Sequence, residues 1–224
     1  MVCVPDLTPE GQSEATKLGL WLRSAGISER RKLTIMPSPF KRTLDTALGL
    51  KQALPQARVL VRPDVFEVGG VYCARGGVRA GPGKCLSAAE IRAQFPSYDT
   101  SLLPQSGAWY TGGWESDGEG RARAARVAAW LRSDEFLASI GDGMAVLVMH
   151  YHFIDALTKA LLGIADEPSR DKPSSNSGHE QPIHVMTPNT ATSLFILSKG
   201  QVSVRWLGST EHLGRTAVEL LAKL

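Results

Sequence analysis

Runs of apolar residues separated by polar segments predict a chain in which helices and strands alternate. Residues 8–25 join a Thr-Pro-Glu start to apolar positions three and four residues apart, which predicts a helix ending at Gly26. The short apolar segment 32–36 predicts a strand. Ser38 and Pro39 predict the cap and first residue of the next helix, and residues 57–63 predict another strand.

The second half of the chain continues this alternation. A capping box over 116–119 opens a helix predicted to reach about residue 139, and the continuous apolar run 144–149 predicts a strand buried on both faces. A helix is predicted over 153–163, and residues 190–207 predict a hairpin that turns at Lys199 and Gly200. This order predicts an α/β fold of three layers, with a mostly parallel sheet, helices on both faces and a C-terminal hairpin.

Two segments interrupt the alternation. Residues 69–114 are rich in glycine, proline and aromatic residues around a short helix whose capping box starts at Ser87, and we expect a lid-like excursion that selects the substrate. Its aromatic side chains, such as Trp109, Tyr110 and Trp114, fit either packing or substrate contact. Residues 164–188 are polar and contain prolines, which predicts a loop insertion. We expect a single domain over 1–224.

Composition narrows the classes of function. The net charge of +3 comes from scattered basic residues, so we expect no nucleic-acid partner, whereas an anionic small molecule or no charged partner both fit. Cys3, Cys73 and Cys85 have no C-x-x-C spacing, so we expect neither a zinc site nor a disulfide framework, and we expect no cofactor. No window approaches the ~20 apolar residues of a membrane span. We therefore expect a cytoplasmic protein.

Polar, ionisable residues follow each of three predicted strands. Ser38 and Arg42 come after the first strand, Glu67 after the second and His150 after the third. Ligands of parallel sheets bind beyond the carboxyl ends of the strands, and an arginine near a helix N-terminus suits phosphate. Each residue also has an ordinary interpretation, as a surface arginine, a loop carboxylate or a core histidine. Their coincidence at one edge predicts a phosphate site.

Six segments in order extend this interpretation to a family. They are LTPEGQSEATKLGLWLR, PSPFKRTLDTA, VFEVGG, ESDGEGRARAARVAAWL, VLVMHYHFIDALTKALLG and NTATSLFIL. Together they resemble the histidine phosphatase superfamily, the phosphoglycerate mutase-like proteins. The resemblance implies a phosphoric monoester hydrolase in which Arg42 of the S-P-x-x-R block and His150 bind the phosphate and His150 also takes part in catalysis. It implies that Glu67 protonates the leaving oxygen. Ser38, at the end of the first predicted strand, is a further candidate for the phosphate site.

The sequence departs from the family at two places: Tyr151 follows His150 where many relatives have glycine, and the more serious departure concerns the nucleophile. In that family an Arg-His-Gly triplet ends the first strand and supplies the histidine that is phosphorylated, but the 224 residues contain no such triplet. We therefore expect the first strand to be missing, which would favour self-association, and activity to be absent or impaired. The alternative is a pseudophosphatase that binds a phosphorylated small molecule or phosphoprotein. Cys3, His152 and Arg75 are further candidates for replacing the lost groups.

Overall fold

A parallel sheet forms the centre of the protein. The computed structural model describes residues 6–27, 32–75, 78–82, 85–164 and 183–214. Its central sheet has four strands in the order β5-β2-β1-β6, and all neighbouring pairs are parallel. The strands are β5 (Tyr98–Asp99), β2 (Arg58–Leu60), β1 (Leu33–Pro37) and β6 (Met144–Val148). The predicted α/β class with a mostly parallel sheet is confirmed.

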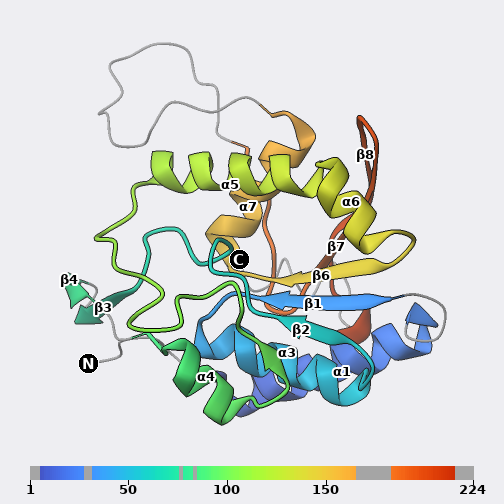
Figure 1. The fold of residues 1–224 in the computed structure, drawn as a ribbon. Coiled ribbons are helices and arrows are strands. Elements are labelled where there is room, and N and C mark those ends of the chain that lie inside the picture. The colour runs from blue at the N-terminus through green and yellow to red at the C-terminus, as the bar shows by residue number, and fades with distance from the viewer. Residues whose placement is uncertain (1–5, 28–31, 76–77, 83–84, 165–182, 215–224) are drawn as a thin grey trace.

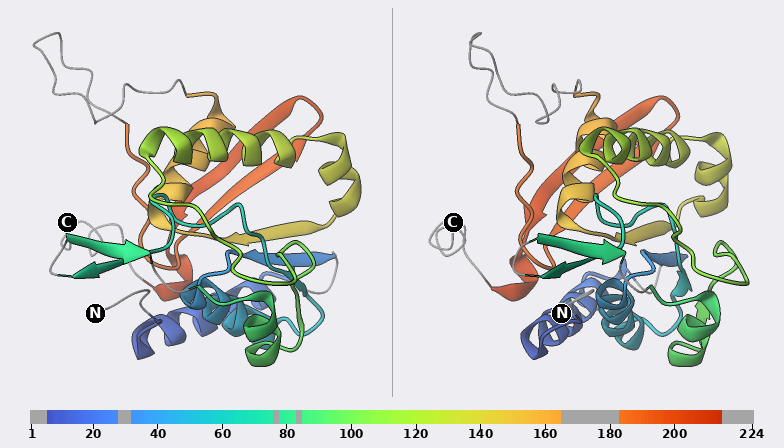
Figure 2. Two further views of the ribbon diagram at one scale, coloured as in Figure 1. Left: turned by 60° about the vertical axis from the view of Figure 1, so that its left-hand side comes forward. Right: turned by 90° about the vertical axis from the view of Figure 1, so that its left-hand side faces the viewer.

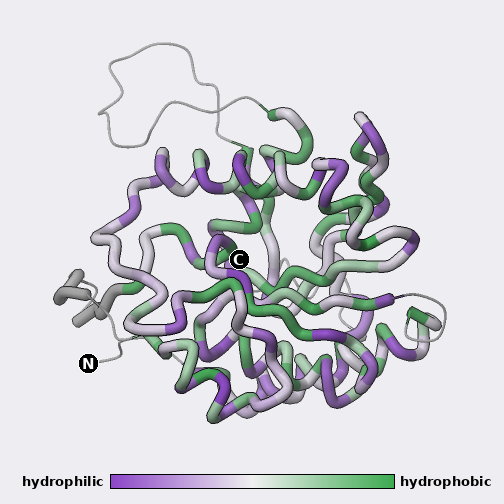
Figure 3. The backbone as a smooth tube through the Cα atoms, viewed as in Figure 1, coloured by the Kyte–Doolittle hydropathy of each residue, from purple (hydrophilic) through white to green (hydrophobic). Residues whose placement is uncertain are grey.

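Helices cover both faces of this sheet (Figure 1). One face carries α1 (Pro9–Ser24), α3 (Lys41–Ala53) and α4 (Ala88–Gln94), and the other carries α5 (Asp117–Leu131), α6 (Asp134–Ile140) and α7 (Tyr151–Leu162). Each layer buries one apolar cluster against the sheet, and the tube in Figure 3 is most hydrophobic along the central strands. Alternate side chains of β6 enter the two clusters, as the period of a strand requires.

The C-terminal hairpin is a separate pair of strands. β7 (Thr192–Ser198) and β8 (Gln201–Ser209) are antiparallel, and the predicted turn at Lys199 and Gly200 is confirmed, with Gly200 at φ 74°. Phe195 and Leu197 pack against the cluster shared with α5 and α7, so the hairpin lies next to the helical layer (Figure 2). A short 3₁₀ helix over Glu211–Leu213 follows β8.

Three local predictions are wrong. The run 144–149 was expected to be buried on both faces, but β6 is an edge strand of the described sheet and its residues are only half-buried. The helix predicted to reach residue 139 is two helices, because the Ser133 hydroxyl accepts from the Phe136 amide and starts α6. Ser38 does not cap the next helix; α3 has Phe40 as N-cap, since the Ser38 hydroxyl is bonded elsewhere.

The excursion over 69–114 holds more regular structure than its composition predicts. The backbone of β3 (Tyr72–Arg75) pairs with β4 (Val78–Pro82) as a hairpin, and α4 begins with the predicted capping box of Ser87 and Glu90. β5 then joins the edge of the central sheet beside β2. The predicted insertion over 164–188 lies largely outside the described residues, although its end contacts α7 through a bond from the Val185 amide to Asp155.

Candidate phosphate-binding site

The carboxyl ends of β1 and β6 bring Ser38 and His150 together. Ser38 directly follows β1, and His150, two residues after the end of β6, is the N-cap residue of α7. The Ser38 amide donates to the Val148 carbonyl at 3.1 Å, which extends the pairing of the two strands by one more bond. Arg42 reaches the same place from the first turn of α3. Residues more than a hundred positions apart in sequence therefore form one cluster.

Both ring nitrogens of His150 have a partner. Arg42 Nε lies 3.2 Å and Arg42 Nη2 lies 2.8 Å from His150 Nδ1, and Ser38 Oγ lies 2.6 Å from His150 Nε2. A guanidinium can only donate, so Nδ1 must accept, and the proton of the neutral ring stands on Nε2. His150 therefore donates to Ser38 and presents a lone pair to Arg42.

The bond from His150 continues through two hydroxyl groups. Ser38 Oγ lies 2.8 Å from Thr43 Oγ1, which in turn lies 2.8 Å from the Phe40 carbonyl and 2.9 Å from the Ser38 carbonyl. Only one direction satisfies the chain: Nε2–H donates to Ser38, Ser38 to Thr43, and Thr43 to the backbone. Since Ser38 is fully buried, these contacts favour an orienting role for its hydroxyl over a direct contact with a ligand.

Electrostatics keep His150 neutral. Burial lowers the pKa of His150 well below its ordinary value, and the nearby positive charges of Arg42 and Arg123 lower it further. The guanidinium of Arg42 also lies over the Phe40 ring at 4.6 Å from its centre, and the same ring contacts His150 edge-on. The cluster thus offers one fixed cation, Arg42, and one histidine whose pKa a bound anion would raise.

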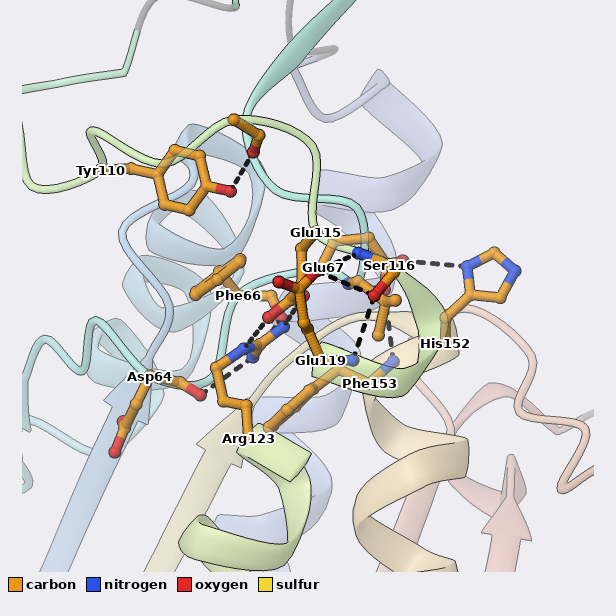
Figure 4. Close-up of polar contacts among 12 residues, drawn as sticks. Asp64, Phe66, Glu67, Tyr110, Glu115, Ser116, Glu119, Arg123, His152 and Phe153 are labelled. Carbon is orange, nitrogen blue, oxygen red and sulfur yellow. Dashed lines mark hydrogen bonds and ion pairs between the residues drawn. The ribbon is translucent and has the colours of Figure 1, made fainter. Parts of the chain in front are cut away.

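Glu67 lies at the N-terminus of α7, beside His150. Its Oε1 accepts from the Val68 amide at 2.9 Å and from the Phe153 amide at 3.2 Å, so the carboxylate caps α7 from another part of the chain (Figure 4). Its Oε2 lies 3.6 Å from Nδ1 of His152, whose side chain is largely exposed. Glu67 is therefore held through Oε1, while Oε2 faces the largely exposed side chain of His152.

The remaining sequence candidates lie apart from this cluster or outside the described residues. Arg75 lies in β3, opposite Val78, and its side chain is outside what the structure describes. Cys3 also lies outside the described residues. His152 lies next to Glu67, as noted, and its side chain is largely exposed.

A pocket of about 330 Å³ is lined by Phe66, the residue before Glu67. Tyr110 and Trp114 from the excursion line it together with the first turns of α5, whereas Trp109 packs between Phe40 and Phe66. The aromatic residues of the excursion thus divide between packing and pocket lining.

Sequence reasoning did not identify Thr43, Glu115 or Arg123 as site residues. Arg123 is buried and donates to two backbone carbonyls of the loop that precedes Glu67. The sequence does hold a signal for it: Arg123 falls between Gly120 and Val127, on the stripe that α5 buries. An arginine on such a stripe needs a buried partner.

The described residues form neither a membrane-crossing helix nor a cluster of metal-binding side chains. Within the described ranges, no helix has the length and apolar content that would let it cross a membrane. In the same part of the chain, no three His, Cys, Asp or Glu side chains are grouped so that they could hold a metal ion.

The site geometry agrees with a match to a protein-family model. The model of the histidine phosphatase superfamily (branch 1) matches residues 4–178. The chain belongs to the histidine phosphatase superfamily. The match spans Ser38, Arg42, Glu67 and His150, and the resemblance stated from the six sequence segments is confirmed.

Solved structures share the fold of this superfamily member. The ecdysone phosphate phosphatase of Bombix mori, solved with tungstate, superposes with a TM-score of 0.60 at 20% identity, over 91% of this chain and 72% of that one. A mycobacterial glucosyl-3-phosphoglycerate phosphatase complexed with VO₃ gives a TM-score of 0.50 at 21% identity, over 92% and 88% of the two chains. At these identities the likeness shows the fold. A search of curated protein sequences returned no match.

Proposed function

We propose that this superfamily member binds a phosphoric monoester at the edge formed by β1 and β6. Arg42 and His150 hold the phosphoryl group, Ser38 and Thr43 orient the histidine, and Glu67 lies at the leaving oxygen as the proton donor. The observation that carries the proposal is the contact of Arg42 with His150 Nδ1 at the ends of two parallel strands. The N-termini of α3 and α7 open at the same edge, where backbone amides favour an anion.

Binding changes the protonation of His150 in this proposal. The neutral ring presents a lone pair at Nδ1, which repels an anionic oxygen. A dianion that accepts from Arg42 neutralises the charge that lowers the pKa of His150, so the ring takes up a proton and donates through Nδ1. Phosphate then receives charge-assisted bonds from two side chains.

We further propose that the 224-residue chain turns the ester over slowly. In-line attack needs a nucleophile placed within reach of phosphorus, and binding groups alone do not supply that step. The sequence given has no Arg-His-Gly triplet to provide the phosphorylated histidine. The same fact supports the second candidate function, a pseudophosphatase that binds a phosphorylated small molecule or a phosphoprotein.

Tungstate binding tests the site directly. Isothermal titration calorimetry of the whole chain should detect tungstate, and Arg42→Ala should weaken binding by about tenfold or more, since a hydrogen bond to a charged group contributes about 1.5–3 kcal/mol. The matched control is Arg23→Ala, which removes an exposed arginine in the last turn of α1. No tungstate binding, or equal losses in both variants, would refute the site.

Hydrolysis of p-nitrophenyl phosphate tests the proposal of slow turnover. Rapid hydrolysis that His150→Ala abolishes would show an active enzyme and contradict both slow turnover and the pseudophosphatase. Tungstate binding without hydrolysis would support them.

A further inference from the structure

A single buried arginine connects three segments of the chain near Glu67. Arg123 is 5% exposed and lies on the buried face of α5. Its Nε donates to Glu115 Oε1 at 2.8 Å and its Nη2 donates to Glu115 Oε2 at 2.6 Å, so the pair is bidentate. Glu115 lies between the excursion, which ends at Trp114, and Ser116, which starts the capping box of α5. The ion pair therefore ties the end of the excursion to the helix.

The other side of the guanidinium holds the loop that precedes Glu67. Arg123 Nη1 donates to the carbonyl of Asp64 and to the carbonyl of Phe66, both at 3.0 Å. These bonds fix the backbone up to the residue before Glu67. A lysine has no planar fork of donors and could not bond a carboxylate and two carbonyls in these directions.

The guanidinium also contacts the two aromatic rings beside the carboxylate. Its central carbon lies 3.6 Å from the centre of the Phe66 ring and 4.2 Å from that of the Phe153 ring, and Figure 4 shows it between these side chains. Phe66 precedes Glu67, and the Phe153 amide donates to Glu67 Oε1. Arg123 thus contacts Phe66, which precedes Glu67 in the chain, and Phe153, whose amide donates to the Glu67 carboxylate.

We propose that Arg123 is a positioning residue for Glu67, holding the carboxylate where it meets the leaving oxygen. This role rests on the proposed function, in which Glu67 is the proton donor. Arg123 touches no substrate in this arrangement. It acts by keeping the loop over 64–67 and the N-terminus of α7 at one separation, so that a single carboxylate oxygen bridges them. A general acid contributes about 10²–10⁴-fold to a reaction only when it is held within hydrogen-bond reach.

The two amides that donate to Glu67 Oε1 allow a sharp test. The Val68 bond joins neighbours in sequence and survives any movement of the loop, whereas the Phe153 bond spans 86 positions and requires the loop and α7 to stay in place. In ¹H–¹⁵N NMR spectra recorded at a single pH, Glu67→Gln should displace the signal of each amide, because the variant replaces the accepting carboxylate with a neutral amide. This displacement, measured in each background, is the Glu67-dependent displacement.

Arg123→Lys should abolish the Glu67-dependent displacement of the Phe153 amide and keep that of the Val68 amide. Arg126→Lys, which changes an exposed arginine one turn further along α5, should keep both. If Arg123→Lys does not fold, as judged by its melting transition, Glu115→Gln is the replacement, because it preserves the size of the ion-pair partner. A full Phe153 displacement in a folded Arg123→Lys or Glu115→Gln protein would overturn the proposal.

The NMR result and the proposed function can fail separately. Absence of tungstate binding by the wild-type chain would count against the phosphate site and leave the link between Arg123 and Glu67 standing. Retention of the Phe153 displacement would remove that link and leave the phosphate site standing.

Discussion

Acid should destabilise this protein through His150. The native ring is neutral, since burial and the charges of Arg42 and Arg123 lower its pKa well below the ordinary value. In the unfolded chain the same side chain titrates near its ordinary pKa of about 6.5. Below that pH the unfolded state binds a proton that the native state does not, so the free energy of unfolding falls as the pH falls.

The size of this effect follows from the difference in bound protons. Between pH 7.5 and pH 5.5, an unfolded histidine with a pKa of about 6.5 goes from about one-tenth to about nine-tenths protonated. While the native ring stays neutral, the free energy of unfolding then falls by about 1.4 kcal/mol, a tenfold change in the folding equilibrium. Glutamine at position 150 would contribute no such change, and its amide can still donate to Ser38.

Urea unfolding of wild type and His150→Gln at a series of pH values measures the effect. The other histidines contribute equally to both proteins, so subtracting the two stability curves isolates His150. The advantage of the wild type over the variant should be constant above about pH 7.5 and shrink by about 1.4 kcal/mol by pH 5.5. A difference that stays flat over this range, or grows in acid, would refute a neutral buried His150.

Three further predictions concern the same region. Ser38→Ala leaves the buried Nε2–H of His150 without its acceptor and should lower the free energy of unfolding by about 1–3 kcal/mol in a urea melt. Gly70→Ala should lower the melting temperature more than Gly107→Ala: both glycines have positive φ, but an added Cβ at Gly70 would clash with Tyr110 Oη, whereas Gly107 has open space. Tungstate binding at neutral pH should take up about one proton, seen as a dependence of the binding enthalpy on the buffer's ionisation enthalpy, and proton release would contradict the proposed role of His150.

The sequence predicted the layers of the fold better than the details of its elements. Apolar periodicity and caps identify α1, α5 and the hairpin because these signals are local. The two-residue strand β5 has no such signal, since its place depends on pairing with β2. The half-buried state of β6 likewise depends on which strands lie beside it, which an apolar run does not reveal.

The site was predictable where it depends on strand ends and not where it depends on packing. Ser38 and His150 follow strands of one parallel sheet, so their proximity follows from topology. The direction of the hydrogen-bond chain through Thr43 follows from atomic distances that the sequence does not contain. Arg123 was overlooked because its partners are two backbone carbonyls and a glutamate from another segment.

The place of β5 restricts how the excursion can vary during evolution. Because β5 lies within the excursion and pairs with β2, replacing all of residues 69–114 would remove an edge strand of the central sheet along with the loops. The stretch between β5 and α5, which carries the pocket residues Tyr110 and Trp114, has no pairing to the sheet. An exchange confined to this stretch would leave all four described strands of the sheet in place, while the segment from α4 to β5 must be inherited with the core.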